Sequence, residues 1–369
     1  MNKNILKQLN NAKRASMLFG LLPHAQRILI LKNLVKELRK NKKIIIRANS
    51  KDSKKISQNN PMRDRLVLNN VRIEGMIKEI EGLLKMPDPI GEIFDCRDRF
   101  RLKICRKRVS IGVIGVIYES RPNVTTDVAA ICIKSGNAVI LKGGKEARES
   151  YIVLHRIIRR ALILSKVNPE VVQFIDPKIK NAVSDIISAN GLVDVIIPRG
   201  SSSLINFVRK NATVPIIETG AGVCHTYVDD EALLDASAKI ILNAKTQRPS
   251  VCNALDTVLI HKKVAKEFLP KMAKLLKEKK VEIFADTGSF KILKNIYPKN
   301  LLKTAKTSDF GREFLSQKMS VKIVSNIDEA IKFINKYSSK HSEAILTENK
   351  NRSDRFLKEI DAAVVYVNA

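Results

Sequence analysis

The N-terminal part of the chain, up to about residue 90, has the hydrophobic periodicity of helices. Within residues 24–41 the apolar residues recur at intervals of three and four: Ile28, Leu31, Leu34, Val35 and Leu38. This spacing places them on one face of an amphipathic helix. Proline and glycine in DPIGEI, residues 88–93, then indicate a turn. The pattern therefore predicts a helical N-terminal region that ends in this turn.

From Val109 onward, short Val- and Ile-rich runs alternate with helical segments. The strands expected in the first series are 109–119, 138–143, 171–175, 193–198 and 214–219. A second series begins near Tyr227, and its expected strands are 256–261, 281–286, 321–325, 342–348 and 362–368. Repeated βα units of this length form mostly parallel sheets that helices cover on both faces. We therefore predict two doubly covered α/β domains that meet near residues 220–230, with ligand crevices beyond the carboxyl ends of strands.

A basic segment, RDRFRLKICRKR at residues 97–108, precedes the first strand series. Its alternation predicts an exposed strand or hairpin with a charged face, which is usually a solvated or interface element. The five cysteines are Cys96, Cys105, Cys132, Cys224 and Cys252. Because their number is odd and no C-x-x-C spacing occurs, the pattern argues against a disulfide framework and against a zinc site.

Composition narrows the class of protein. A chain of 369 residues with 44% hydrophobic residues and no Trp is typical of a soluble α/β protein of two domains. The apolar runs are too short to span a bilayer and no signal peptide is evident, so we expect a cytoplasmic protein. The net charge of +30 is spread over nearly every expected helix without a nucleic-acid-binding motif. We therefore predict no nucleic-acid partner, although a polyanion partner is an alternative that the charge leaves open.

Two loops that follow expected strands carry candidate anion-binding motifs. Lys142 ends one strand and is followed by Gly143 and Gly144, which suits a phosphate or ribose; an ordinary tight turn explains the same residues. Gly200 and Ser201 stand at another expected helix start, where Ser201 is either part of an anion site or an ordinary N-cap.

Cys252 lies where a basic, proline-containing loop enters a buried strand. A thiol at this position is structural filler, a metal ligand or a nucleophile. No pair among the five histidines has metal-ligand spacing, so the sequence predicts no metal site. A Cys/His protease using His225 is conceivable chemistry, but no signature of such a family is present. The residues alone leave filler and nucleophile open.

Several segments resemble, in order and spacing, the gamma-glutamyl phosphate reductase family of the aldehyde dehydrogenase superfamily. They are GVIGVIYESRPNVTTDVAAICIKSGNAVILKGGKEA, IIPRGSSSL, IETGAGVCHTYVD, NAKTQRPSVCNALDTVLIH, VKIVS, HSEAILTE and AAVVYVNA. The resemblance covers essentially the whole chain. It implies NADPH-dependent reduction of L-glutamyl 5-phosphate to glutamate 5-semialdehyde, the second step of proline biosynthesis, with Cys252 as the covalent nucleophile.

The resemblance also assigns roles to individual residues. Asn123 and the backbone N–H of Cys252 would stabilise the oxyanion. Lys142 would bind the adenosine ribose of NADP(H), and Gly200 and Ser201 would lie near its pyrophosphate. Arg248 is the candidate for an anion contact in the substrate pocket, with an exposed loop arginine as the alternative. Glu218 corresponds to the general base of oxidising aldehyde dehydrogenases and is left out of the catalytic set, because a reductase does not use that water.

The implied architecture is an NADP-binding domain at 1–222, with a basic oligomerisation hairpin at about 95–110, and a catalytic domain at 223–369. The family continues beyond the last expected strand, so we expect weaker assembly and low activity if Ala369 is the terminus. The alternative functions are a truncated, non-catalytic remnant and an oxidising aldehyde dehydrogenase. We also expect a homo-oligomer, provided that assembly does not require the segment by which the family extends beyond the last expected strand. Association with glutamate 5-kinase is a hypothesis that the lability of the acyl phosphate motivates.

Overall fold

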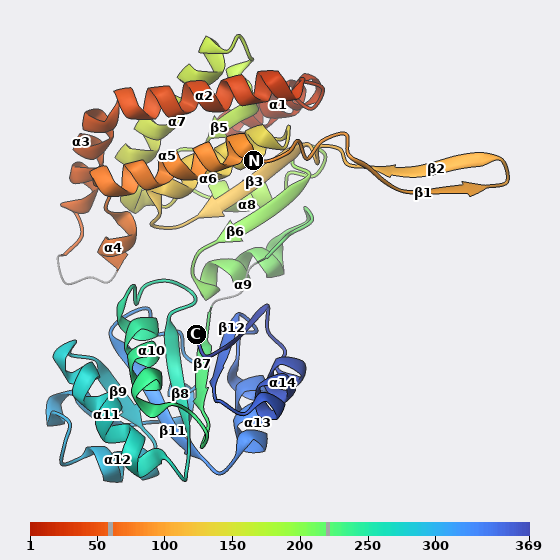
Figure 1. Ribbon diagram of the computed structural model, residues 1–369. Helices are drawn as coiled ribbons and strands as arrows, with labels where there is room; N and C mark the ends of the chain where they lie inside the picture. The colour runs from red at the N-terminus through yellow and green to blue at the C-terminus, as the bar shows by residue number, and fades with distance from the viewer. Residues whose placement is uncertain (58–61, 219–221) are drawn as a thin grey trace. The chain divides into compact units, whose positions relative to one another are not determined.

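The computed structural model describes residues 1–57, 62–218 and 222–369. It divides into a first unit, Met1–Thr219, and a second unit, Gly220–Ala369 (Figure 1). The prediction of an α/β protein with parallel sheets and a small hairpin is confirmed. The predicted boundary falls beside residues 219–221, which lie outside the described residues, and the roles predicted for the two domains stay predictions.

The first unit begins with the predicted helical region. Its helices are α1 (Lys3–Phe19), α2 (His24–Lys40), α3 (Lys42–Ser53), α4 (Met62–Leu66) and α5 (Asn70–Lys85). Helix α2 buries Leu31 and Leu34 as expected, but it also buries Ile30, while the predicted core residue Ile28 is only partly buried. Arg27 joins the buried face because its guanidinium donates to both carboxylate oxygens of Asp88, at 3.0 and 2.8 Å. A charged residue thus shares the buried face with Leu31 and Leu34, four and seven residues further along the helix.

A four-stranded parallel sheet forms the core of the first unit, in the order β5-β4-β3-β6. Its strands are β3 (Val113–Tyr118), β4 (Ala138–Lys142), β5 (Val172–Phe174) and β6 (Val195–Arg199). The connecting helices are α6 (Pro122–Lys134), α7 (Arg148–Leu164) and α8 (Ala182–Ile187), and α9 (Ser202–Asn211) follows β6. The chain runs outward from β3 to β5 and then returns to β6 on the other side of β3. Right-handed crossovers therefore place α6 and α7 on one face and α8 on the other, where α1 also packs.

One strand predicted in this unit is wrong. Residues 214–219 form no strand in their described part; Ile216 only bridges to Ile196. The apolar run resembles a strand because Val214 is buried and Ile216 partly buried, but the backbone pairs with β6 at a single position. Hydrophobicity alone did not distinguish a buried extended segment from a paired one.

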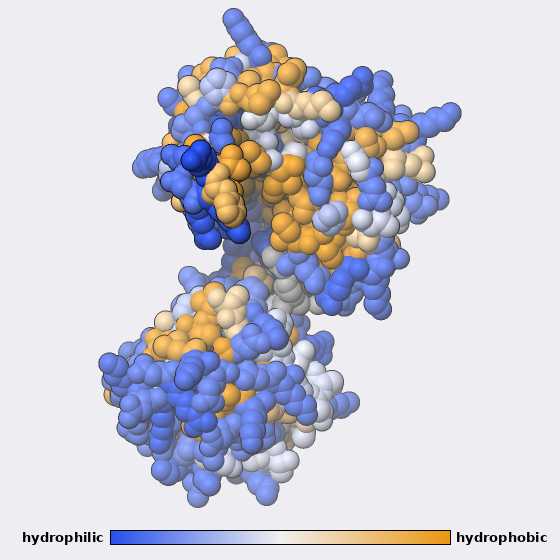
Figure 2. Space-filling model, turned by 90° about the vertical axis from the view of Figure 1, so that its right-hand side faces the viewer, coloured by the Kyte–Doolittle hydropathy of each residue, from blue (hydrophilic) through white to orange (hydrophobic). Residues whose placement is uncertain are grey.

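The basic segment forms an antiparallel hairpin, β1 (Ile93–Arg99) and β2 (Leu102–Lys107), which extends away from the first unit (Figure 1). Every residue of both strands is exposed. Cys96 and Cys105 form a disulfide across the hairpin, so the expectation that the odd cysteine count disfavours disulfides is wrong for this pair. Over most of the face seen in Figure 2 the surface is hydrophilic, with apolar patches on both units.

The second unit is built on a parallel sheet of seven strands in the order β10-β9-β11-β8-β7-β12-β13. The strands are β7 (Cys224–Val228), β8 (Leu255–His261), β9 (Glu282–Ala285), β10 (Leu302–Thr304), β11 (Lys318–Val324), β12 (Ser342–Leu346) and β13 (Val364–Val367). The helices are α10 (Leu234–Thr246), α11 (Ala265–Glu278), α12 (Thr287–Leu293), α13 (Ile327–Tyr337) and α14 (Lys350–Glu359). Two separate apolar clusters pack against α10 and α11 and against α13 and α14, which agrees with a doubly covered sheet. Strand β10 was not predicted.

No helix among the described residues is long and apolar enough to cross a membrane.

Candidate active site

Cys252 lies in the loop between α10 and β8, so it precedes the amino end of a strand. The loop that carries this candidate nucleophile therefore precedes a strand, whereas ligand crevices were expected beyond the carboxyl ends of strands. Two turns shape the loop: the N–H of Val251 donates to the carbonyl of Arg248 at 3.3 Å, and that of Ala254 donates to the carbonyl of Val251 at 3.2 Å. The Cys252 side chain is partly exposed between these turns.

A buried lysine ties the two ends of this loop together. Lys245, in the last turn of α10, is fully buried, and its ammonium donates to the carbonyl oxygen of Leu255 at 2.7 Å. It also lies 3.6 Å from the Asp256 carboxylate. Burial lowers the pKa of Lys245, and burial raises the pKa of Asp256 to about 6. Because the bond joins α10 to the first residue of β8, it fixes the span that the Cys252 loop must cross.

The backbone of Cys252 is supported from β7. A Cβ atom at Gly222 would overlap the carbonyl group of Cys252, so only glycine allows this close approach. The thiol of Cys224 donates to the same carbonyl oxygen at 3.3 Å. Burial raises the pKa of Cys224, and burial raises that of Cys132 to about 12. Of the three free cysteines, these two are therefore buried neutral thiols, while Cys252 is the one with access to solvent.

A cavity of about 200 Å³ opens beside this loop, and Arg248 is among the residues that line it. The first residues of three parallel strands, Cys224, Leu255 and Ser342, also line it, so it lies at the amino ends of the strands. His225 is part of its wall, but the ring contacts Glu343, with 3.0 Å between Nδ1 and Oε2, and not a cysteine. The Cys/His pairing considered from sequence is therefore not formed. The described residues contain no group of His, Cys, Asp and Glu that could hold a metal ion.

A second pocket, of about 320 Å³, lies in the first unit, beyond the carboxyl ends of its strands. Lys142 from the end of β4, Ser120 after β3 and Leu204 in the first turn of α9 line it. From β3 the chain continues to β4 and β5 on one side, and it later returns to form β6 on the other side of β3. The strand order thus reverses at β3, and such a topological switch point is where α/β sheets bind ligands. Lys142 is partly buried, and this burial lowers its pKa.

Two carboxylates that sequence reasoning missed organise this pocket. Glu146 accepts from the backbone N–H and the hydroxyl of Ser120, at 2.6 and 2.8 Å. Glu119 accepts from the backbone N–H of Ser201 at 2.8 Å, which connects Ser201 to the pocket. Ser201 is also the N-cap of α9, because its hydroxyl accepts from Leu204 N–H at 3.4 Å. A lysine, two carboxylates and a helix start suit ribose hydroxyls and a phosphate, so these residues fit a dinucleotide.

Glycines next to these carboxylates allow the backbone to approach them. A Cβ atom at Gly200 would come within 2.6 Å of a Glu119 carboxylate oxygen, and one at Gly144 would overlap Glu146. In the sequence Gly144 lies two residues from Glu146, so that pair could have been recognised, whereas Gly200 lies 81 residues from Glu119. What the sequence did not reveal is that Glu119, at the end of β3, reaches the start of α9.

The remaining predicted residues lie apart from these pockets. Asn123, in the first turn of α6, donates from its amide to Asp127 at 2.8 Å. Burial, with repulsion from Glu79 as the next cause, raises the pKa of Asp127 to about 7. Glu218 forms an exposed ion pair with Arg209 at 3.0 Å. Asn123 belongs to the first unit and Cys252 to the second, so the structure of each unit gives no distance between them.

Comparison with known proteins identifies the family. Residues 2–289 match the Aldehyde dehydrogenase family. The chain is 45% identical to the gamma-glutamyl phosphate reductase of Legionella pneumophila (strain Philadelphia 1), over 100% of this chain and 88% of that protein. It is 48% identical to the enzyme of that name from Clostridium acetobutylicum, over 90% of this chain and 79% of that protein.

Solved structures agree with these matches. The crystal structure of gamma-glutamyl phosphate reductase from Thermotoga maritima superposes with a TM-score of 0.88 and 39% identity, covering 99% of this chain and 88% of that one. An acetylating aldehyde dehydrogenase from Geobacillus thermoglucosidasius, at 16% identity and a TM-score of 0.75, shares the fold. The chain therefore belongs to the aldehyde dehydrogenase family and, within it, to the gamma-glutamyl phosphate reductases.

Proposed function

We propose that the protein reduces L-glutamyl 5-phosphate to L-glutamate 5-semialdehyde and phosphate, with NADPH as reductant, in proline biosynthesis. The observation that carries the proposal is the Cys252 loop. Within a chain 45% identical to named gamma-glutamyl phosphate reductases, it presents a partly exposed thiol on a backbone held from two sides. Buried filler would not need a solvent-accessible sulfur or a cavity beside its loop.

Cys252 acts as the nucleophile in this proposal. Its thiolate attacks the acyl carbon, the carbon–oxygen bond to phosphate breaks, and a thioester forms on Sγ. NADPH, when bound, supplies the hydride that reduces the acyl group. The thiohemiacetal on Cys252 then collapses, which releases the aldehyde and regenerates the thiol. An oxidising aldehyde dehydrogenase would instead hydrolyse the thioester with an activated water, and the ion pair of Glu218 with Arg209 gives that residue another partner.

Two donors would stabilise the negative oxygen in each tetrahedral species. One is the backbone N–H of Cys252, and the other is the side-chain amide of Asn123. An amide NH₂ group has two N–H donors. Asn123 uses one for Asp127, and the second is the one proposed for the oxyanion. Asp127 thereby acts as a positioning residue that fixes the plane of the Asn123 amide.

The substrate and cofactor roles follow from the two pockets. Arg248 lines the cavity beside the Cys252 loop, as do Val251 and Asn253 but not Cys252 itself, and is proposed to contact an anionic group of the substrate. Lys142 is proposed to bind the adenosine ribose of NADP(H), while Gly200 and Ser201 contact the pyrophosphate. Glu146 would accept from ribose hydroxyls. The first unit would accordingly be the NADP-binding domain and the second the catalytic domain.

Location and assembly are part of the same proposal. We propose a cytoplasmic location, where glutathione and thioredoxin would reduce the exposed disulfide that Cys96 and Cys105 form in the structure. The exposed hairpin is proposed as an arm for a homo-oligomer, and glutamate 5-kinase as a partner that would protect the acyl phosphate.

One experiment separates the candidate reactions. Purified protein is assayed with glutamate 5-semialdehyde and NADP⁺, with and without inorganic phosphate. We expect NADP⁺ reduction only with phosphate; phosphate-independent turnover would indicate an oxidising dehydrogenase, and no turnover in either assay a non-catalytic remnant. Cys252→Ala should abolish the reaction, while the matched variant Cys132→Ala should retain it. Turnover retained by Cys252→Ala would overturn the nucleophile assignment.

A further inference from the structure

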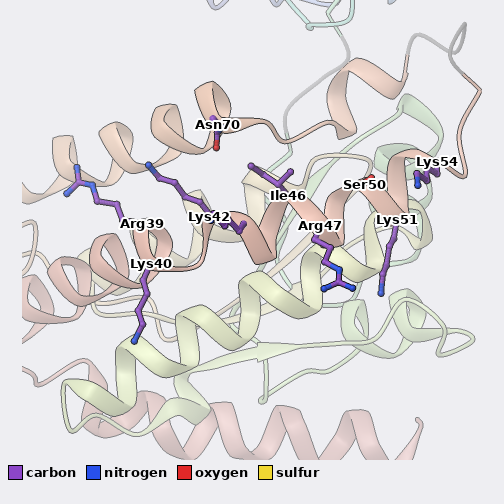
Figure 3. A pocket seen from close by; sticks show the side chains of 10 residues that line it. Arg39, Lys40, Lys42, Ile46, Arg47, Ser50, Lys51, Lys54 and Asn70 are labelled. Carbon is purple, nitrogen blue, oxygen red and sulfur yellow. The ribbon is translucent and has the colours of Figure 1, made fainter.

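A third pocket, of about 730 Å³, lies in the N-terminal helices and belongs to neither site described above. The end of α2, most of α3 and the start of α5 line it (Figure 3). Of its ten lining residues seven are Lys or Arg, and none is Asp or Glu. The chain as a whole has 67 basic and 37 acidic residues. The lining is therefore enriched in positive charge even relative to this basic protein.

Most of these cations have no acidic neighbour. Arg39 pairs with Glu81 at 2.7 Å, and Lys42 pairs with Glu74. Among the residues that the structure describes, the other five have no carboxylate within ion-pairing distance: Lys40, Lys43, Arg47, Lys51 and Lys54. All five are exposed. Two acids thus neutralise two cations, and five positive charges remain around one pocket.

Four of the five lie along a single face of α3 and its C-cap residue, Lys54. Lys43, Arg47, Lys51 and Lys54 are spaced by four, four and three residues, and such spacing stacks side chains along one side of a helix. In Figure 3 the side chains of Arg47 and Lys51 point to the same side of α3, and Lys40 at the end of α2 points that way too. Repulsion between like charges at this spacing has a cost in helix stability. An anion bound along the face would remove that cost.

The opposite face of α3 is fixed in the unit, so the cationic face is presented rigidly. Asp52 is fully buried and accepts from the backbone N–H and the hydroxyl of Ser150, both at 2.8 Å. Asn49 is also buried and donates to the carbonyl of Leu66 at 2.8 Å. At 1.5 Å per residue, the cationic face from Lys43 to Lys54 extends over about 16 Å. A single phosphate ion is too short to contact all four cations.

The lining decides the class of ligand. Ile46 is its one apolar residue and no aromatic residue belongs to it, so the pocket offers neither a base-stacking platform nor an apolar anchor for an acidic peptide. We propose that this face of α3 binds a linear chain of linked phosphate groups, recognised by charge and not by base. Inorganic polyphosphate fits this description, and the phosphodiester backbone of single-stranded RNA presents a similar row of negatively charged phosphates.

Binding is tested on the full chain with three probes: inorganic polyphosphate, single-stranded RNA, and orthophosphate at matched phosphorus. The variant Lys43→Gln/Arg47→Gln/Lys51→Gln removes three of the cations, and Gln keeps a helix propensity close to that of Lys and Arg. The matched control, Lys266→Gln/Lys274→Gln/Lys277→Gln, removes three exposed charges from α11 in the second unit. Both variants change the net charge equally, so they separate the pocket from the overall charge.

We expect polyphosphate to bind the parent protein and orthophosphate not to. The α3 variant should weaken polyphosphate binding at least about tenfold and lower the slope of log affinity against log salt by about two units, since each phosphate contact contributes roughly 0.7. The control variant should stay within about twofold of the parent. If RNA binds the parent protein but not the α3 variant, the phosphodiester backbone is also a ligand of this face. If RNA does not bind the parent, the ligand is free polyphosphate.

Equal weakening by both triple variants, or equal affinity of orthophosphate, would overturn the proposal, because net charge would then explain the binding. Reductase activity without probe should be the same in the α3 variant and the parent. Loss of that activity would contradict the independence of this site from the catalytic one. A far-UV circular dichroism spectrum of the α3 variant checks that the helices are retained.

Discussion

The two units place their candidate sites at opposite ends of parallel strands. In the first unit, Lys142 and Ser120 line a pocket beyond the carboxyl ends of β4 and β3. In the second unit, Arg248 and Cys252 precede the amino end of β8. The carboxyl-end pocket results from topology. The connections to β4 and to β6 lie on opposite sides of β3, and a crevice forms between them. Topology alone produces no such crevice at the amino end of β8.

The second site is therefore built from specific contacts. Lys245 joins the end of α10 to the start of β8, Cys224 donates to the Cys252 carbonyl, and Gly222 leaves room for that carbonyl. Each contact acts on the backbone of the loop and not on the thiol. A site held in this way should be sensitive to small steric changes, whereas a site made by topology should lose affinity gradually when single side chains are removed.

The sharpest test of this difference is Gly222→Ala. Its Cβ would overlap the Cys252 carbonyl, so the loop must move, and displacement of a reacting group by about 1 Å can cost about a hundredfold in rate. We expect kcat/KM to fall at least about a hundredfold. Gly75→Ala is the control, since nothing lies within 4 Å of its added methyl. Nearly full activity in Gly222→Ala would show that the loop is not held by this contact.

Buried carboxyls give a second comparison between the units. Burial raises the pKa of Asp127 in the first unit to about 7 and that of Asp256 in the second, beside Lys245, to about 6. The unfolded chain loses these protons near pH 4, so between pH 4 and 7 the folded state binds more protons. The free energy of unfolding should therefore fall as pH rises through this window.

Asp127→Asn should flatten that decline. Because the pKa of Asp127 rises from its ordinary value of 3.8 to about 7, the upper bound of the effect is about 4 kcal/mol, at about 1.36 kcal/mol per pKa unit. The decline in unfolding free energy that remains between pH 4 and 6 would then be due to Asp256. The Asn side chain introduced at position 127 keeps an oxygen that can accept from Asn123. Urea unfolding of parent and variant at pH 4, 5.5 and 7 measures both parts. An unchanged pH dependence in the variant would mean that Asp127 ionises normally in the folded protein.

The sequence predicted the parts of both sites that depend on one segment. Lys142 at a strand end and Cys252 before a strand can each be recognised from a dozen neighbouring residues. The contacts that hold them join distant segments: Glu119 reaches Ser201, and Cys224 reaches Cys252. Periodicity and propensity are local and do not contain such pairs. The same limit explains why the pairing of Arg27 with Asp88, across 61 residues, was not predicted.

Lys142→Met tests the topology-derived pocket. The cation is partly buried beside Glu146, and its loss should raise the KM for NADPH about tenfold, while kcat changes by less than about threefold, because the thiol chemistry lies elsewhere. Lys145→Met is the control, as Lys145 is exposed. Steady-state kinetics with NADPH and NADH measure the effect. If kcat fell as much as kcat/KM, Lys142 would act in the transition state and not in binding.

The smallest expected effect separates a helix cap from a cofactor ligand at Ser201. Its hydroxyl caps α9, and removal of a serine cap costs about 1 kcal/mol of stability. Asn326→Ala removes the corresponding cap of α13, where the side chain accepts from Glu329 N–H at 3.0 Å, so both variants should lose similar stability in urea unfolding. Only Ser201→Ala should also raise the KM for NADPH, by about threefold, because α9 starts beside the switch-point pocket. An unchanged KM would reduce Ser201 to a cap, and the anion site at this helix start would then rest on backbone N–H groups alone.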